Sequence, residues 1–282
     1  GGSQNNDNCT HTVVQQLLQQ YERLNDLRVA TSPPRKVPAE LWADFTENGH
    51  TMVLDWYRDD SYPSYYTTWP RAHLRAMQYL ASSRQPGVNY PKVDPYIYEY
   101  LDTLGGSDAF QHASVVIMGS AVPWYEALAL EFGAAQTMTI EYNRVYYGDP
   151  RMKSMLSSEY WALSSNRPRY DIGMSISSFE HDGLGRYGDP VNAFGDFEAM
   201  TEMESIITEG GLLVLAVPVG AEALVWNVHR IYGRKRLGRL LQRWTILHQL
   251  GLYDGIFEQR TYVPSQPVFV LQNTRPDIPR VF

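Results

Sequence analysis

The chain has little cysteine, little lysine and no long apolar run. Its 282 residues include one cysteine, Cys9, which excludes an internal disulfide framework, a thiolate zinc site and an iron–sulfur cluster. The formal net charge of −7 argues against broad, non-specific binding to a phosphate backbone. No stretch of about 18 apolar residues is present that would span a bilayer. The 44% of hydrophobic residues is enough for a sizeable core, so we predict a folded protein with no nucleic-acid partner.

The N-terminal residues bear on location. Gly1, Gly2 and Ser3 resemble an expression remnant, which leaves room for a membrane anchor or signal peptide upstream of this sequence. The triplet 8–10 (Asn-Cys-Thr) is a glycosylation sequon, which matters only in the secretory pathway. These features favour a secretory compartment such as the Golgi lumen, with the cytoplasm as the alternative.

Residues 10–106 are predicted to form a helical, tyrosine-rich extension that follows a tail at residues 1–9. Apolar positions at helical spacing predict helices over 10–27, 39–45 and 71–81. Eleven Tyr and Trp residues lie between Trp56 and Tyr100. We expect this extension to act as a lid or an acceptor-binding wall over the domain that follows, with simple packing against that domain as the alternative.

Residues 107–282 alternate short apolar runs with helical patterns. This alternation is typical of an α/β fold with a doubly wound, Rossmann-like parallel sheet. Ligands bind such sheets outside the carboxyl ends of the strands, so polar residues at those ends are candidate site residues. Strands are predicted at 115–118, 137–140, 170–177, 212–217, 255–258 and 268–272, and helices at 124–132, 194–207 and 237–249.

The first candidate site follows the first predicted strand. Gly119, Ser120 and Ala121 form a strand-to-helix turn, and Glu141 ends the next strand. A nucleoside ligand needs a close backbone approach at the first turn and an acid on the second strand for its ribose hydroxyls. The three-glycine dinucleotide fingerprint and the lysine of a phosphate-binding loop are both absent. The pattern therefore favours an adenosine ligand without phosphates, such as S-adenosylmethionine, over NAD or ATP; a plain tight turn is the alternative.

The second candidate site is a polar loop after the strand at 170–177. Glu180, His181 and Asp182 open it, and glycines at 183, 185 and 188 allow it to fold tightly. A histidine beside carboxylates is suited to act as a general base. The same three side chains could instead hold a divalent metal, although adjacent residues rarely converge on one ion. A capped turn with a surface histidine is a further alternative.

A third polar segment, 226–233, follows the strand at 212–217. Its polar side chains are suited to orient an acceptor or to supply a second base, and a helix with a solvated polar face is the alternative. The basic run 234–243 is interpreted as a solvated helix face rather than a nucleic-acid patch. The polar residues of the segment are Asn227, His229, Arg230 and Tyr232.

Several of these motifs together resemble a known family. The string from Ser178 to Pro190, with segments 195–196, 210–212, 217–220 and 227–233, resembles the domain of unknown function 268 family, over roughly residues 114–271. That family is similar to class I S-adenosylmethionine-dependent methyltransferases. The resemblance implies that the turn 119–121 binds the methionine part of the cofactor, that Glu141 and Tyr142 hold the ribose, and that residues 177–182, with Ser177 and Ser178 first, face the methyl group. One departure is that Trp124 follows the first turn, where it either narrows the pocket or packs against the ligand.

The sequence thus predicts an S-adenosylmethionine-dependent O-methyltransferase. The predicted acceptor is a small molecule or a sugar hydroxyl of a glycan, and His181 is the predicted base, oriented by Asp182 or Glu180, with His229 as the alternative base. Expected acceptor-binding residues are Tyr187, Asp189, Asn227, Arg230, Tyr232, Trp56 and Tyr65.

Two other functions remain open. An N-methyltransferase of a small molecule or a protein would line its acceptor pocket with acids rather than histidine. A non-catalytic scaffold with a methyltransferase-like fold would have lost cofactor binding, and the glycine-poor first turn supports that reading. The sequence leaves the oligomeric state open.

Overall fold

The computed structural model describes residues 32–60, 67–103 and 109–274. Those from Pro33 onward belong to one compact unit. The helix predicted over residues 10–27, and Tyr65, lie outside the described residues. Within the described ranges, no helix is both long and apolar enough to cross a bilayer.

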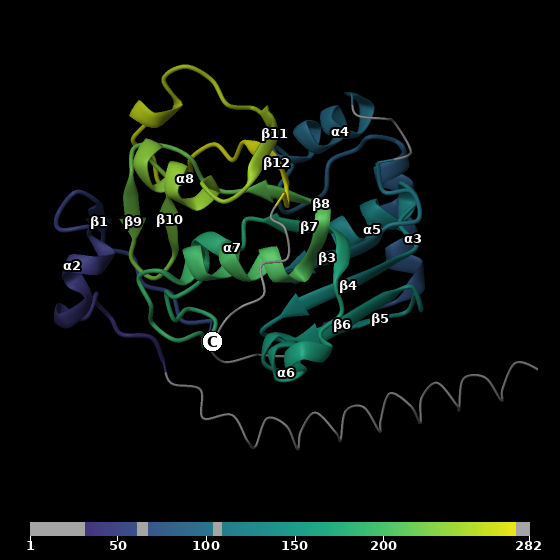
Figure 1. The fold of residues 1–282 in the computed structure, drawn as a ribbon, viewed down its shortest axis with the longest axis horizontal. Coiled ribbons are helices and arrows are strands. Elements are labelled where there is room, and N and C mark those ends of the chain that lie inside the picture. Colours follow the sequence, from purple (N-terminus) through teal and green to yellow (C-terminus); the bar gives the residue numbers. More distant parts are fainter. Residues whose placement is uncertain (1–31, 61–66, 104–108, 275–282) are drawn as a thin grey trace, which may run out of the picture. The chain divides into compact units, whose positions relative to one another are not determined.

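A seven-stranded sheet forms the centre of this unit (Figure 1). The strand order is β11-β12-β8-β7-β3-β4-β6; β12 is antiparallel to both neighbours, and the pairs from β8 to β6 are parallel. The chain runs from β3 outward to β4 and β6 and then returns to β7, so the topological switch point lies between β3 and β7. The predicted doubly wound, Rossmann-like fold is confirmed. The strands are β3 (Ser114–Met118), β4 (Gln136–Glu141), β6 (Met152–Leu156), β7 (Tyr170–Ile176), β8 (Ile207–Ala216), β11 (Thr245–Leu250) and β12 (Val268–Gln272).

Helices cover both faces of the sheet because side chains along a strand alternate between the two faces. Val115 and Ile117 of β3 belong to one hydrophobic cluster and Val116 belongs to the other. α3 and α4 belong to the predicted extension and contribute side chains to the first cluster. Residues 71–103 therefore share a core with the sheet. The first cluster includes α3 (Arg71–Ser82), α4 (Asp94–Thr103) and α5 (Trp124–Glu131); the second includes α6 (Ser157–Ala162), α7 (Gly195–Ile206) and α8 (Arg234–Leu241).

Segments of the extension also contribute strands to two small sheets. In one, β1 (Met52–Leu54) runs parallel to β9 (Ala223–Val225), which is antiparallel to β10 (His229–Ile231). In the other, β2 (Thr67–Trp69) runs parallel to β5 (Val145–Tyr147). The remaining elements are α2 (Trp42–Phe45) and the 3-10 helices η1 (Ala39–Leu41), η3 (Ser164–Asn166), η4 (Phe179–His181) and η5 (Ile256–Glu258).

Two predicted elements are wrong. The helix predicted over 237–249 is α8, which ends at Leu241, followed by β11, because pairing with β12 outweighs the helical spacing of the leucines. The strand predicted at 255–258 is η5, which begins after Gly255 at φ 83°. The helix given as the alternative for residues 226–233 does not form either, because these residues contain the turn and second strand of a hairpin. The prediction from the sequence also lacked α4, β5, β6, α6 and the early start of β8 at Ile207.

Candidate functional site

A cleft of about 210 Å³ opens at the carboxyl ends of β3, β4 and β7, on either side of the switch point. Ten of the predicted site residues line it, so the first and second candidate sites of the sequence meet in one place. They are Gly119, Ser120, Ala121, Glu141, Tyr142, Ser177, Ser178, His181, Asp182 and Tyr187.

The turn after β3 is held close to the turn after β7. Gly119 has φ +67°, and a β-carbon there would lie 2.3 Å from Ser178 Oγ. The Gly119 N–H donates to the Ile140 carbonyl at 3.0 Å, which ties the turn to β4 as well. Glycine is therefore required at this position both by its backbone conformation and by the lack of space.

Beneath this turn lies Glu126, a fully buried side chain of α5 that the sequence analysis did not select. Its carboxylate accepts hydrogen bonds from the hydroxyls of Ser120 (3.1 Å), Thr139 (2.6 Å) and Tyr147 (3.3 Å). Burial raises the pKa of Glu126 to about 7. The only sequence signal was a single acid in the otherwise apolar stretch 124–130.

The second strand brings Glu141 and Tyr142 to the cleft. Glu141 is half-buried and its Oε2 accepts the backbone N–H of Tyr142 at 2.9 Å. The Tyr142 hydroxyl reaches across to Asp182 Oδ1 at 3.4 Å. The end of β4 and the loop after β7 are thus joined across the cleft by side chains.

The extension forms one wall of the cleft through Asn89 and Tyr90. It is anchored by Asp94 of α4, whose buried carboxylate accepts the Gly87 N–H (2.6 Å) and the Tyr125 hydroxyl (3.0 Å). Burial raises the pKa of Asp94.

Trp124 packs beneath the same wall. Its ring lies so close to Gly87 that a β-carbon at position 87 would stand 2.7 Å from it. Trp124 is 5% exposed and lines the cleft, where it packs against the extension.

In the Glu180–His181–Asp182 triplet, the histidine is oriented by the backbone rather than by a carboxylate. His181 Nδ1 contacts the Val228 carbonyl. A carbonyl only accepts, so this nitrogen carries the hydrogen and Nε2 carries the lone pair. His181 Nε2 lies 3.7 Å from Glu180 Oε1. Burial is the main cause that lowers the pKa of His181 to about 3, and the nearby Arg186 lowers it further. The bond to the Val228 carbonyl acts in the opposite direction.

The two carboxylates of the triplet have different surroundings. Glu180 is fully buried beneath the cleft and accepts the Ser177 hydroxyl, and burial raises its pKa to about 7. Asp182 lines the cleft; burial and then the nearby Asp189 raise its pKa. Among the described residues, no group of three His, Cys, Asp or Glu side chains is arranged to hold a metal ion.

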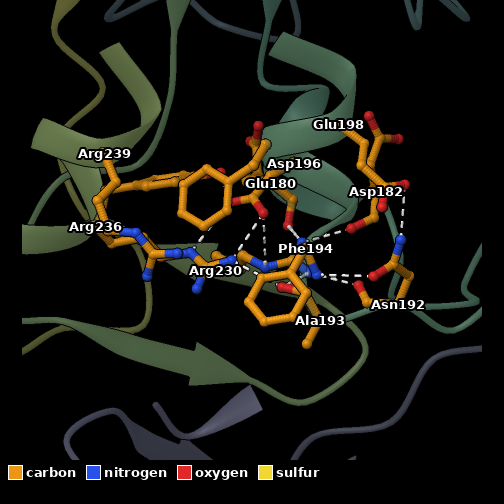
Figure 2. A network of polar contacts seen from close by, with 12 residues as sticks. Glu180, Asp182, Asn192, Ala193, Phe194, Asp196, Glu198, Arg230, Arg236 and Arg239 are labelled. Atoms are coloured by element: carbon orange, nitrogen blue, oxygen red, sulfur yellow. Dashed lines mark hydrogen bonds and ion pairs between the residues drawn. The ribbon is translucent and has the colours of Figure 1, made fainter. Parts of the chain in front are cut away.

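Arg230 lies outside the cleft and holds the triplet loop in place (Figure 2). Its guanidinium is 2% exposed and donates to four backbone carbonyls. Two belong to Glu180 (3.3 Å) and Asp182 (2.6 Å), and the other two belong to residues 192 and 193. Arg230 is also 3.7 Å from the buried Asp196. An arginine supplies five donors in a planar group, so one side chain can satisfy several carbonyls that would otherwise be buried without partners.

The basic run 234–243 is only partly a solvated face. Arg236 is 3% exposed and forms an ion pair with Asp196 at 2.7 Å and with Glu47 at 3.2 Å. The expectation of a solvated face is wrong for Arg236, because its helix packs against α7 rather than standing free.

The other predicted site residues lie outside the cleft lining. The Asn227 side-chain amide accepts the Arg58 N–H with its oxygen and donates to the Arg58 carbonyl with its nitrogen. The Tyr232 hydroxyl donates to Asp196 at 3.0 Å. Asp189 accepts the N–H groups of residues 185 and 187 and so closes the triplet loop. The His229 ring lies 6.4 Å from that of His181, and Trp56 is 40% exposed next to Tyr262.

Residues 112–266 match the family described as "Caenorhabditis protein of unknown function, DUF268". The chain belongs to this family. No curated protein sequence matches the chain significantly.

The solved structures similar to this DUF268 chain include three methyltransferases. The N-methyltransferase NodS from Bradyrhizobium japonicum WM9 aligns over 67% of this chain and 100% of its own, with 12% identity and a TM-score of 0.45. The 1,6-didemethyltoxoflavin-N1-methyltransferase from Burkholderia thailandensis, solved with S-adenosylhomocysteine, aligns over 71% and 79%, with 14% identity and a TM-score of 0.44. An S-adenosylmethionine-dependent methyltransferase from Clostridium acetobutylicum aligns over 70% and 97%, with 11% identity and a TM-score of 0.43. Against two further structures, the DUF268 chain spans about half of their length, 49% and 47%.

Several cleft residues of the DUF268 chain were not selected from the sequence. Asn89 and Tyr90 come from the extension, where the aromatic excess was the available signal. Trp161 and Ser157 belong to α6, a helix that the sequence analysis missed, and Glu202 comes from α7. These positions are brought to the cleft by packing between segments far apart in the sequence.

Proposed function

We propose that this DUF268 protein is an S-adenosylmethionine-dependent methyltransferase. The observation that carries the proposal is the cleft at the switch point, where the first turn, Glu141 and the turn after β7 converge. A nucleoside ligand requires this combination of close backbone approach and an acid at the end of the second strand. The parallel strands from β8 to β6 place these residues at one edge of the sheet.

The chemical character of the cleft supports a positively charged ligand. Glu141, Asp182 and Glu202 line it, together with Trp124, Trp161 and several tyrosines. Carboxylates attract a cation, and aromatic faces stabilise one that is removed from water. The cofactor would supply a methyl group bound to a sulfonium ion, which suits this lining.

We further propose that the acceptor is a hydroxyl of a small molecule, with a sugar hydroxyl of a glycan as the first class to test. Aromatic side chains beside polar groups suit the apolar faces and hydroxyl edges of a sugar, and Tyr187, Tyr90 and Trp161 supply such surfaces in the cleft. The residues of this chain would act mainly by positioning the hydroxyl against the methyl group. His181 and Ser177 line the same space, and both lie next to the buried Glu180.

An amine acceptor is the second candidate function. It is favoured by the three acids of the cleft lining, since a cationic amine is attracted by carboxylates before it is deprotonated. The two candidates differ in the acceptor that turns over, and they share the cofactor.

Calorimetry with S-adenosylmethionine and S-adenosylhomocysteine tests the cofactor. We expect both to bind and to raise the melting temperature, whereas NAD and ATP should do neither. Transfer of labelled methyl from S-adenosylmethionine to panels of sugars, phenols and amines then tests the acceptor class. Absence of binding by both sulfur compounds would contradict the proposal and favour a non-catalytic scaffold.

A further inference from the structure

A buried carboxylate with one free oxygen lies behind the cleft wall. Glu180 is 0% exposed, and its Oε2 has no hydrogen-bond partner among the described residues. A buried carboxylate with an unsatisfied oxygen is costly unless it takes up a proton. Packing alone does not explain a buried carboxylate oxygen without a hydrogen-bond partner next to a ligand cleft.

Ser177 connects this carboxylate to the cleft. Its hydroxyl donates to Glu180 Oε1 and accepts the side-chain N–H of Gln266 at 3.0 Å. Ser177 itself lines the cleft and has φ +55°, a strained conformation for a residue with a side chain. Ser177 also hydrogen-bonds Tyr90 of the cleft wall, so its one hydrogen and two lone pairs are all engaged, and the Tyr90 hydroxyl lies between Ser177 and the cleft.

His181 is poorly placed to hold a second proton, which would sit on Nε2. Its Nδ1 is committed to the Val228 carbonyl, and its Nε2 faces Glu180 Oε1 at 3.7 Å. Burial lowers the pKa of His181 to about 3 and raises that of Glu180 to about 7. Of these two side chains, Glu180 is therefore the one that takes up a proton near neutral pH, where part of it is still ionised.

We propose that Glu180 is the proton acceptor of the methyl-transfer site and that Ser177 conducts the proton to it from the cleft. This inference rests on the proposed function. The acceptor hydroxyl gives its proton to the Tyr90 oxygen, the Tyr90 proton passes to Ser177 Oγ, and the Ser177 proton passes to Glu180 Oε1. The C–O bond forms as the S–CH3 bond of the cofactor breaks, so the positive sulfonium and the negative carboxylate are both neutralised.

The charges around Glu180 come from several elements. The Arg230 guanidinium on β10 lowers its pKa, and Asp196 on α7 raises it, both less than burial does. The other titratable groups facing it are His181 and Asp182 of its own loop, Tyr90 of the extension and Tyr232 after β10. Arg230 and Asp196 also pair with each other, so their opposite effects on Glu180 partly cancel.

The test compares proton release on binding of S-adenosylmethionine and S-adenosylhomocysteine. The two differ by one methyl group and by the sulfonium charge, which favours the ionised form of a nearby carboxyl. Calorimetry at pH 7 in two buffers of different ionisation enthalpy measures the protons exchanged. We expect S-adenosylmethionine to release about 0.4 proton more than S-adenosylhomocysteine. In Glu180→Gln this difference should vanish while both compounds still bind.

Glu126→Gln is the matched control, because Glu126 is the other fully buried glutamate with a pKa near 7. This variant should keep the difference in proton release. Equal proton release by the two compounds in the wild type, or loss of the difference in Glu126→Gln and not in Glu180→Gln, would overturn the inference. If neither compound binds the wild type, the proposed function itself fails.

A second measurement needs no variant. The infrared difference spectrum between the two complexes of the wild type should show the loss of a protonated carboxyl band when the sulfonium is present. An unchanged carboxyl band at pH 7 would contradict the assignment even if Glu180→Gln did not fold.

Discussion

The backbone of Gly119 and the side chain of Ser178 are in such close contact that a β-carbon at position 119 would lie 2.3 Å from Ser178 Oγ. These residues follow β3 and β7, the two strands that flank the switch point. The contact therefore fixes the spacing between the two turns that line the cleft.

Replacing this glycine tests whether that spacing serves the cofactor. Gly119→Ala should lower the affinity for S-adenosylhomocysteine at least about tenfold and destabilise the protein by about 1–3 kcal/mol, because φ +67° is strained for alanine and Ser178 must move. The control is Gly210→Ala, which has φ +75° but nothing within 4 Å of the added atom. It should show the stability loss without the affinity loss, as measured by calorimetry and urea unfolding. Equal affinities for both variants would contradict the role of the turn.

Glu141 is expected to hold the ribose hydroxyls of the cofactor. Glu141→Ala should lower the affinity for S-adenosylhomocysteine by about 10- to 100-fold, since a hydrogen bond to a charged group is worth about 1.5–3 kcal/mol. Its melting temperature without ligand should change little. Glu209→Gln, at an exposed position on β8, removes the same charge away from the cleft and should bind normally. Unchanged binding by Glu141→Ala would exclude this residue from the cofactor site.

Arg230 is expected to act through the loop rather than by touching a ligand. Arg230→Met should cost about 3–5 kcal/mol of unfolding free energy, because four buried carbonyls and Asp196 lose a shared donor. Arg230→Lys should recover only part of it, since an ammonium cannot match the planar set of donors. Urea unfolding measures both. A loss below about 1 kcal/mol for the methionine variant would show that the loop is held by other contacts.

Glu126 should make stability depend on pH. Burial raises its pKa from 4.5 to about 7, so between these values the folded protein keeps a proton that the unfolded chain has released. Stability must therefore fall as the pH rises through this window, by up to about 3 kcal/mol for this group.

In Glu126→Gln this contribution is absent. The free energy of unfolding of the wild type relative to Glu126→Gln should thus decline between pH 4.5 and 7 and stay level above it. His181 has a lowered pKa and acts in the opposite direction, but it does so in both proteins and cancels in the difference. Urea unfolding from pH 5 to 8 gives the comparison; parallel curves for the two proteins would refute it.

The sheet and the turns that line the cleft at the carboxyl ends of β3, β4 and β7 were predictable because they depend on local patterns. A run such as 115–118 is apolar and β-branched, and the glycine after it marks a turn whether or not the rest of the chain is known. Parallel strands then bring residues at their carboxyl ends to one edge. Gly119, Glu141 and Ser177 could therefore be expected at one cleft from their positions in the chain.

The segments whose contacts or conformation could not be predicted from the sequence depend on distant partners. Arg230 and Asn227 look like ligand-binding residues because they are polar and follow a strand, yet they bond to backbone 37 to 50 and 169 residues away. The segment at 245–250 has a helical pattern and becomes an edge strand only because β12 lies beside it.

The sequence by itself determined the α/β sheet and the residues at the carboxyl ends of the strands, because these follow from hydrophobic periodicity and turn chemistry over short distances, and its motifs indicated the family. Only the tertiary structure decided which of the polar residues face the cleft and which hold the loops in place. It also placed Glu180 and His181 in surroundings that raise the pKa of the first and lower that of the second, because burial and the neighbouring charges that set a pKa come from segments distant in the chain.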